Sequence, residues 1–159
     1  MKVLLVNPPR SPCNALRDHA PEPVRRFVHT RLVGPPLGLL TVAVAAREVL
    51  RAFEPGRVLH INVLLHVTAL CDCFGMGQPS IVPDVGIMVS PDVVAVEKAT
   101  LDAIGRQPFF PEALPGGREE AEGRKHPFER AWGKDPYVQV VEASKLGMGS
   151  LKYRVRQWV

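Results

Sequence analysis

The chain has 159 residues, of which 46% are hydrophobic and 23% are charged, and its formal net charge is +4. This length and composition predict one domain with a hydrophobic core and leave too little chain for two domains of ordinary size. The basic residues are scattered, so the positive charge predicts a solvated surface rather than a nucleic-acid site.

The sequence offers no membrane or export segment. No apolar run approaches the roughly 20 residues that a membrane-spanning helix needs. The start of the chain, MKVLLVNPP, lacks the length and the small-residue cleavage site of a signal peptide. The three cysteines are an odd number and argue against a disulfide framework. We therefore expect a cytoplasmic protein whose partners include neither a membrane nor a nucleic acid.

The first third of the chain predicts one strand and one helix. Val3–Val6 is a short apolar run that ends at Asn-Pro-Pro, as a buried strand would. Residues 34–53 predict a helix, because Pro36 suits a first helical turn and leucines and alanines follow almost without a polar break. A helix that is apolar on nearly all sides is expected to be buried. Glu54–Arg57 then predicts a turn, and we place the main boundary there.

The middle of the chain predicts two strand regions and a helix. Residues 58–70 and 80–90 are rich in strand-forming side chains. Asp92–Ile104 predicts a helix with Ser90 as its cap and with apolar side chains close to helical spacing. Gly105 follows as the expected stop.

The last third predicts a loop, a helix and a strand. Residues 107–132 are expected to form a loop. A helix is expected to start at Asp135 or Pro136 and to stop at Gly147, and residues 152–159 predict a final strand. The order strand, helix, strands, helix, helix, strand favours an α/β fold.

Two of the three cysteines, Cys71 and Cys73, are separated by one residue beside a glycine-rich turn. Thiolates bind soft or borderline metals and iron–sulfur clusters, and both sulfurs can face one ion where the backbone turns sharply. Such a pair supplies two ligands, whereas a closed zinc or four-iron site usually takes four. The candidate supplements within the chain are Asp72, His60, His66 and Cys13.

Other interpretations of these residues stay open. The cysteine pair could be two partly buried thiols at a strand end, or a redox pair, although a Cys-x-Cys disulfide closes a small, strained ring. Asp84 is a candidate metal ligand and Asp92 a candidate for a role beside the cysteines, but turn chemistry and a helix dipole also explain them. His60 and His66 favour hydrogen-bonded core or edge histidines over ligands. Asp102 is interpreted as a helix-surface group.

Four short motifs occur in order along the second part of the chain: Cys-Asp-Cys, Pro-Asp-x-Gly, Ser-x-Asp-x-Val-Ala and Lys-Leu-Gly-x-Gly-Ser. With them, residues 58–156 resemble the carboxy-terminal part of the domain-of-unknown-function 362 family, whose members are described as uncharacterised iron–sulfur centre proteins. The resemblance implies an iron–sulfur cluster as cofactor, with Cys71 and Cys73 in contact with it. It implies no particular reaction.

The opening, MKVLLVNPPRSP with RLVGPPLGLLTVAVAARE, resembles the start of the cobalamin-binding domain of radical S-adenosylmethionine enzymes. For residues 1–54 this implies an incomplete Rossmann-like strand–helix unit, joined to a mixed α/β region over residues 58–156. The D-x-H-x-x-G cobalamin-ligand motif and the C-x-x-x-C-x-x-C cluster motif are absent from the sequence. One strand–helix unit cannot enclose a corrin, so cobalamin is not expected.

Two functions follow from these observations. An iron–sulfur- or metal-associated, redox-linked protein would use Cys71 and Cys73 as its contact site and would need a redox or oligomeric protein partner to complete the ligand set. A non-catalytic α/β interaction module, or a vestigial fusion of two family fragments without a metal, would instead use its apolar elements to contact a partner. Whether the chain is an enzyme is left open.

Overall fold

A computed structural model describes residues 35–70, 77–114 and 123–157, with side chains from residue 42 onward. The helices are α3 (Pro35–Arg51), α4 (Val93–Gly105), α5 (Pro127–Trp132) and α6 (Val138–Lys145) with the 3-10 helix η3 (Pro111–Ala113), and the strands are β1 (His60–Leu64) and β2 (Gly86–Ser90). The strand predicted over Val3–Val6 lies outside the described residues.

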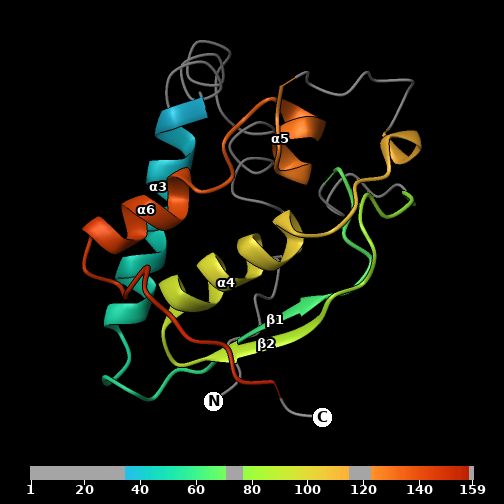
Figure 1. Ribbon diagram of the computed structural model, residues 1–159. Coiled ribbons are helices and arrows are strands. Elements are labelled where there is room, and N and C mark those ends of the chain that lie inside the picture. Colours follow the sequence, from blue (N-terminus) through green and yellow to red (C-terminus); the bar gives the residue numbers. More distant parts are fainter. Residues whose placement is uncertain (1–34, 71–76, 115–122, 158–159) are drawn as a thin grey trace.

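The two strands form an antiparallel sheet in which Asn62 lies opposite Met88. Helix α4 runs across one face of this sheet (Figure 1). The Asn62 amide joins the two layers, because it donates to Glu97 Oε1 and Thr100 Oγ1 of α4, each at 2.9 Å. This mixture of helices and a small sheet confirms the coarse α/β prediction, while the Rossmann-like unit stays a prediction.

Helix α6 packs against α3 and also contacts α4 (Figure 1). On α3, Ala43 is buried, whereas Val42, Val44 and Val49 are exposed. The prediction that this helix is buried on nearly all sides is therefore wrong for its described side chains. The reason is that, among the described elements, the contacts of α3 are chiefly with α6, which covers only part of its surface.

Two clusters of buried side chains hold these elements together. The larger cluster joins the end of α4, α5 and η3 to the segments that flank the sheet, and Ile81 and Val82 lie fully buried at its centre. The smaller cluster joins α4 to α6 through Val94, Leu101 and Val140. Full burial of one such side chain contributes about 1.5–3 kcal/mol, so these contacts supply much of the stability of the fold.

Helix α4 begins after Asp92, whose Oδ1 accepts a hydrogen bond from the Ala95 amide at 2.9 Å. The prediction that Ser90 caps the helix is wrong. Ser90 Oγ instead accepts a hydrogen bond from the Asp92 amide at 3.0 Å, one step before the cap. Asp92 rather than Ser90 caps the helix because it has an extended backbone and lies three residues before Ala95. From there its short carboxylate reaches an amide of the first turn. Gly105 is the last helical residue rather than the stop.

Helix α5 forms where the sequence predicted a loop. Pro127 stands in its first turn, His126 Nδ1 accepts a hydrogen bond from the Phe128 amide at 3.2 Å, and Gly133 ends the helix with a φ of 66°. These start and stop signals are present in the sequence, but a helix of 6 residues is too short to show a periodic pattern. His126 is buried and its Nε2 donates to the Leu101 carbonyl at 2.9 Å, which ties α5 to α4.

Helix α6 ends at Lys145, two residues before Gly147, the glycine that was predicted to stop it. The Gly147 amide donates to the Ser144 carbonyl at 3.0 Å, and the Met148 amide donates to the Ala143 carbonyl at 3.1 Å. With a φ of 73° at Gly147, this is the Schellman arrangement that satisfies the last carbonyls of a helix. The prediction of a helix stop at this position is confirmed.

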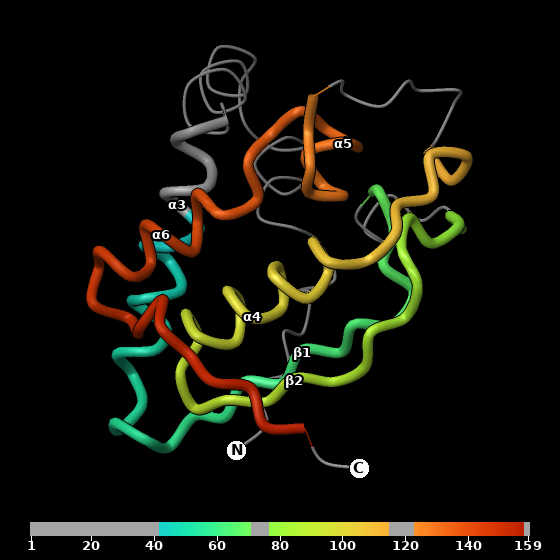
Figure 2. The backbone as a smooth tube through the Cα atoms, in the orientation of Figure 1, coloured from blue at the N-terminus to red at the C-terminus, as the bar shows by residue number. Residues whose placement is uncertain are grey.

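Residues 152–157 form no strand, which corrects the prediction of a final strand. The tube in Figure 2 follows this segment from the end of α6 back toward the sheet. A groove of about 230 Å³ lies between β2 and the segment, lined by Ile87–Ser90 on one side and by Tyr153–Arg156 on the other. Because the groove separates the two backbones, the C-terminal segment runs beside the sheet without joining it.

Candidate functional site

Two segments, residues 65–70 and 77–85, flank the predicted Cys-x-Cys site. They are joined close to that site, because the Leu70 amide donates to the side-chain Oε1 of Gln78 at 2.9 Å. Further from it, Thr68 and Ser80 form an isolated antiparallel bridge. These contacts hold the two flanking segments together as the base of a hairpin, which we call the hairpin base.

His66 and Asp84, two of the sequence-predicted site residues, meet in the hairpin base. Asp84 Oδ1 accepts a hydrogen bond from the His66 amide at 2.7 Å, and His66 Nδ1 lies 3.0 Å from Ser80 Oγ. Both residues are exposed. His66 lies beyond the end of β1 and has a φ of 53°, so the prediction that it belongs to a strand is wrong. The left-handed turn at His66 aims its amide at the carboxylate.

Trp132 connects the hairpin base to α5. Its indole Nε1 donates to the Ala69 carbonyl at 2.6 Å, across 63 residues of sequence. Ala69 itself is buried in the larger cluster. A tryptophan at this position is expected by default to pack against other apolar side chains. Its polar contact could not have been located without knowing that α5 lies beside the hairpin base.

His60 lies away from the hairpin base, at the opposite end of β1, where it pairs with Ser90. Burial lowers the pKa of His60, and the nearby carboxylates of Glu97 and Asp92 oppose that change only in part. The structure therefore separates the two predicted histidines. His66 lies beside Asp84, and His60 lies near the start of α4.

Asp92 has two structural partners. While Oδ1 caps α4, Oδ2 accepts a hydrogen bond from the Ser150 amide at 2.9 Å. A Cβ atom on Gly149 would lie 2.0 Å from Asp92 Oδ1, so any larger residue at that position would have to displace the Asp92 side chain. Two of the motifs noted in the sequence, Ser-x-Asp and Gly-x-Gly-Ser, thus meet here for a reason of packing.

The predicted ligands Cys71 and Cys73, and the candidate supplements Asp72 and Cys13, lie outside the described residues. Within residues 35–70, 77–114 and 123–157, no three His, Cys, Asp or Glu side chains gather so that they could hold a metal ion. In that part of the chain the candidate donors nearest the cysteine segment in sequence are the side chains of His66 and Asp84. The described residues therefore form no metal site by themselves.

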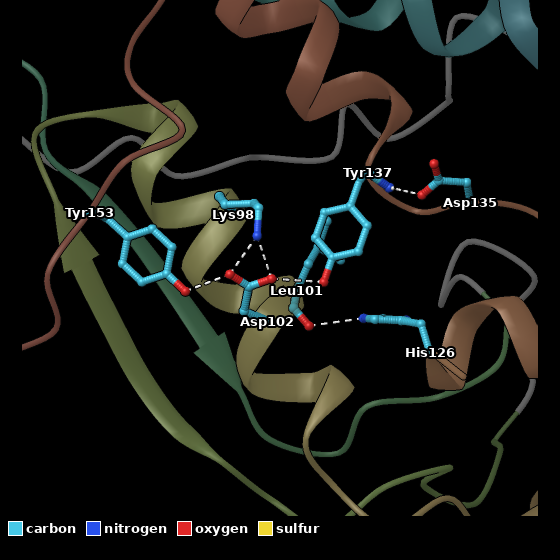
Figure 3. Close-up of polar contacts among 7 residues, drawn as sticks. All are labelled: Lys98, Leu101, Asp102, His126, Asp135, Tyr137 and Tyr153. Carbon is cyan, nitrogen blue, oxygen red and sulfur yellow. Dashed lines mark hydrogen bonds and ion pairs between the residues drawn. The ribbon is translucent and has the colours of Figure 1, made fainter. Parts of the chain in front are cut away.

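A second polar cluster surrounds the Asp102 side chain of α4 (Figure 3). It was not predicted from the sequence. Lys98 Nζ lies 2.5 and 2.6 Å from the two carboxylate oxygens of Asp102. The Tyr137 hydroxyl donates to Oδ1 at 2.8 Å and the Tyr153 hydroxyl to Oδ2 at 2.5 Å. Lys98 also lies 4.8 Å from the centre of the Tyr137 ring. The expectation that Asp102 is a helix-surface group is wrong, because these side chains cover it.

The contacts of this cluster fix its charges. Burial acts to raise the pKa of Asp102, but the hydrogen bonds from Lys98, Tyr153 and Tyr137 together outweigh burial and leave that pKa below its ordinary value. Burial, followed by the hydrogen bond to Asp102, raises the pKa of both Tyr137 and Tyr153. The carboxylate therefore stays charged and both phenols stay neutral near pH 7. The cluster acts as a clamp that joins α4, the start of α6 and the C-terminal segment.

Comparisons with protein-family models, with curated proteins and with solved structures find no match to this chain. The two family resemblances and the division into residues 1–54 and 58–156 accordingly stay predictions. Among the residues that the structure describes, no helix combines the length and the apolar character needed to cross a membrane.

Proposed function

We propose that this chain holds a soft metal ion or an iron–sulfur cluster through the thiolates of Cys71 and Cys73. The observation that carries the proposal is the hairpin base. Within it the Leu70 amide donates a hydrogen bond to the Gln78 side chain, and the Trp132 indole of α5 donates one to the Ala69 carbonyl. A ligand pair carried between two fastened segments loses less conformational entropy on binding than a pair on a free chain. The two segments that flank the cysteines are thus fixed relative to each other, which favours ligation by the pair.

The nature of the other ligands decides which group is bound. His66 and Asp84 offer an imidazole nitrogen and a carboxylate oxygen at the same hairpin base. Together with the two thiolates they would make a four-ligand set that suits Zn²⁺. A four-iron cluster takes thiolates, so two more would come from a partner chain, and the complex would act in electron transfer. A reducing compartment such as the cytoplasm would keep the thiols available.

Metal analysis of anaerobically purified and reconstituted protein tests this proposal. We expect iron and sulfide, or zinc, in the wild-type chain and their loss in a Cys71→Ser/Cys73→Ser variant. Cys13→Ser is the matched control for loss of one thiol and should retain the metal, because the ligand set proposed here does not include Cys13; loss of the metal in that variant would make Cys13 a further ligand. His66→Gln and Asp84→Asn should weaken zinc binding and leave iron binding unchanged. The same metal content in the wild type and the double variant, or no metal in either, would overturn the proposal.

A second candidate function, an interaction module without a metal, is favoured by the outer face of the sheet. Four apolar side chains stand there as two cross-strand pairs, Ile61 with Val89 and Val63 with Ile87. Their exposed fractions are 41% and 54% in the first pair and 60% and 63% in the second. Exposed apolar side chains that adjoin one another in this way mark contact surfaces more often than scattered ones do.

Sedimentation measured over a range of protein concentrations tests this second function, because it reports whether the chain associates. If the outer face mediates association, the wild-type chain should associate with increasing concentration and a Val63→Asn/Ile87→Asn variant should not. Val155→Asn is the control, because Val155 is as exposed as Val63 and lies in the C-terminal segment. A wild-type chain that remains monomeric, or a double variant that associates as the wild type does, would contradict the interaction module in this form.

A further inference from the structure

A cavity of about 650 Å³ lies beside the end of α3, the start of α4 and the turn that follows α6. We call it the arginine cavity, because Arg47 and Arg51 of α3 line it together with His60 and with apolar side chains such as Phe53 and Met148. Its volume is in the range of about 300–1,000 Å³ that is typical of small-molecule sites. The hairpin base lies at the other end of β1 from His60, so the arginine cavity is separate from the hairpin base.

An apolar slot adjoins the arginine cavity. This slot, of about 270 Å³, lies between α3, α4 and α6, and small side chains line much of it, among them Ala43, Ala46 and Ala143. Val93 and Met148 line both spaces, so the slot and the arginine cavity meet at these two side chains. A ligand that extends from one space into the other would have an apolar chain in the slot and a polar end beside the arginines.

The two arginines carry one positive charge more than their acidic partner neutralises. Arg47 Nη2 lies 2.9 Å from Glu48 Oε1, and Arg51 Nη1 lies 3.5 Å from the same oxygen. In the described part of the chain, Glu48 is the only acidic side chain that pairs with either arginine. A guanidinium group offers five N–H donors in a planar fork that matches a carboxylate, so a second carboxylate is the group that suits this pair.

The other polar groups of the site orient such a ligand. Glu97 lines the slot, where its negative charge disfavours a carboxylate, and its Oε1 accepts a hydrogen bond from Asn62 at 2.9 Å. Glu54 lines the arginine cavity, but its side chain is 80% exposed and lies 3.3 Å from Arg57, so water and Arg57 screen its charge. The His60 ring has no hydrogen-bond partner among the described residues, and burial lowers its pKa, so near neutral pH it offers one N–H donor. The negative end of a ligand is therefore favoured beside the arginines rather than in the slot.

We propose that this site binds a small carboxylate with an apolar chain, a free fatty acid of medium length. The carboxylate lies beside Arg47 and Arg51, and the chain extends past Met148 into the slot. Charge complementarity selects the head group, since a hydrogen bond that involves ions is about twice as strong as one between neutral groups. The slot selects the chain, since each CH₂ group that leaves water strengthens binding about fourfold. No cysteine takes part, so the inference does not depend on metal binding.

An NMR titration of the wild-type chain with octanoate, 1-octanol and acetate tests this proposal. Octanoate has both the charge and the chain, 1-octanol has the chain alone, and acetate has the charge alone. We expect octanoate to bind at least about tenfold more tightly than 1-octanol, to shift the methyl resonances of Ala46 and Met148, and to bind far more tightly than acetate. No binding of octanoate, equal affinity for octanoate and either of the other two probes, or shifts confined to other residues would overturn the proposal.

A pair of double variants tests the head group. Arg47→Gln/Arg51→Gln should weaken octanoate binding at least about tenfold and leave 1-octanol binding nearly unchanged. Arg154→Gln/Arg156→Gln removes the same charge from the C-terminal segment and is the matched control, which should bind octanoate as the wild type does. Equal weakening in both variants would indicate a nonspecific attraction to positive charge, and weakening in neither would exclude the two arginines of α3. Either result would overturn the proposal.

A substitution in the slot tests the position of the chain. Ala46→Leu should fill part of the slot and weaken the binding of octanoate and 1-octanol alike, since both place the same chain there. Unchanged binding of octanoate by the folded variant would overturn the proposal. If this variant does not fold, the methyl shift of Met148 in the wild-type chain still reports whether the ligand reaches the slot.

Discussion

The Tyr153 hydroxyl donates to Oδ2 of Asp102 at 2.5 Å, across 51 residues of sequence. The other oxygen of the same carboxylate accepts a hydrogen bond from Tyr137, so both tyrosines of the chain bind one side chain of α4. Lys98 supplies the positive charge that balances the carboxylate. The position of the C-terminal segment therefore depends on the ionisation of Asp102.

Replacing Asp102 by asparagine should destabilise the fold by about 1–3 kcal/mol, the usual range for hydrogen bonds to a partly buried charged group. An amide cannot accept from both phenols through two equivalent oxygens, and it leaves Lys98 without its counter-charge. Urea unfolding of Asp102→Asn measures the change, with Glu112→Gln as a control at an exposed position. Equal midpoints for the two variants would show that the clamp contributes nothing.

The lowered pKa of Asp102 predicts loss of stability in acid. Its contribution is fully present above the ordinary aspartate value of 3.8 and is lost as the pH falls through the lower value of the folded state. Urea midpoints measured from about pH 2.5 to pH 7 should fall at the acid end, and the fall should be smaller in Asp102→Asn. The same acid dependence in both proteins would assign it to other carboxylates.

The raised pKa values of Tyr137 and Tyr153 predict a second loss of stability in alkali. A phenol whose pKa is higher in the folded state contributes stability that is complete below its ordinary value of 10.0 and is lost as the pH rises through the folded-state value. Tyrosinate absorbance should therefore rise together with unfolding rather than before it. In Tyr137→Phe the stability should depend less on pH above about 10. Ionisation of both phenols in a folded chain would contradict this.

Gly149→Ala should cost about 1–3 kcal/mol, because the new methyl group would displace the Asp92 side chain from the Ala95 and Ser150 amides. Thermal unfolding followed by circular dichroism gives the change. Gly77→Ala is the matched control, since a Cβ at that position meets nothing within 4 Å. If both alanine variants melt at the wild-type temperature, Asp92 must hold its partners by another route.

Trp132→Phe should loosen the hairpin base while leaving the aromatic packing of α5 in place. The substitution removes the indole donor to the Ala69 carbonyl and leaves that carbonyl without its partner, at a cost of about 1–2 kcal/mol. Hydrogen exchange of residues 66–70 and 77–85 should become faster, whereas exchange within α6 should not change. Uniform acceleration across the chain would indicate global destabilisation instead.

Helices α4 and α6 could be predicted from the sequence because their signals are local. A proline and an aspartate precede α4, and Gly147 terminates α6 through bonds within the same turn. The error at Ser90 has a local cause too, since Ser90 and Asp92 are both good caps and only the backbone geometry selects one of them. The positions of these two helices were thus accessible to within a few residues, whereas the short helix α5 and the absence of a strand over residues 152–157 were not.

The side-chain contacts of the Asp102 cluster and of the hairpin base could not be predicted from the sequence in the same way. Lys98 and Asp102 have the spacing of an exposed helix pair, and that pattern contains nothing about the distant tyrosines that cover the carboxylate. His66 and Asp84 were each named as candidates, but their meeting depends on the antiparallel pairing of the hairpin base. Cys71 and Cys73 lie outside the described residues, so their role remains the proposal made above.

The double role of Asp92 has a consequence for the order in which the protein folds during synthesis. Its carboxylate caps α4, but Oδ2 can accept its hydrogen bond from the Ser150 amide only after the ribosome has added 58 more residues. The hydrogen bond from the Tyr153 hydroxyl to Asp102 likewise forms only after Tyr153 has been synthesised. On the ribosome, α4 can form early from local contacts, but these two carboxylates reach their final partners only after residues 149–153 have emerged. The last residues of the described chain thus complete the central helix, and a pause in translation before them would leave α4 formed but incompletely anchored.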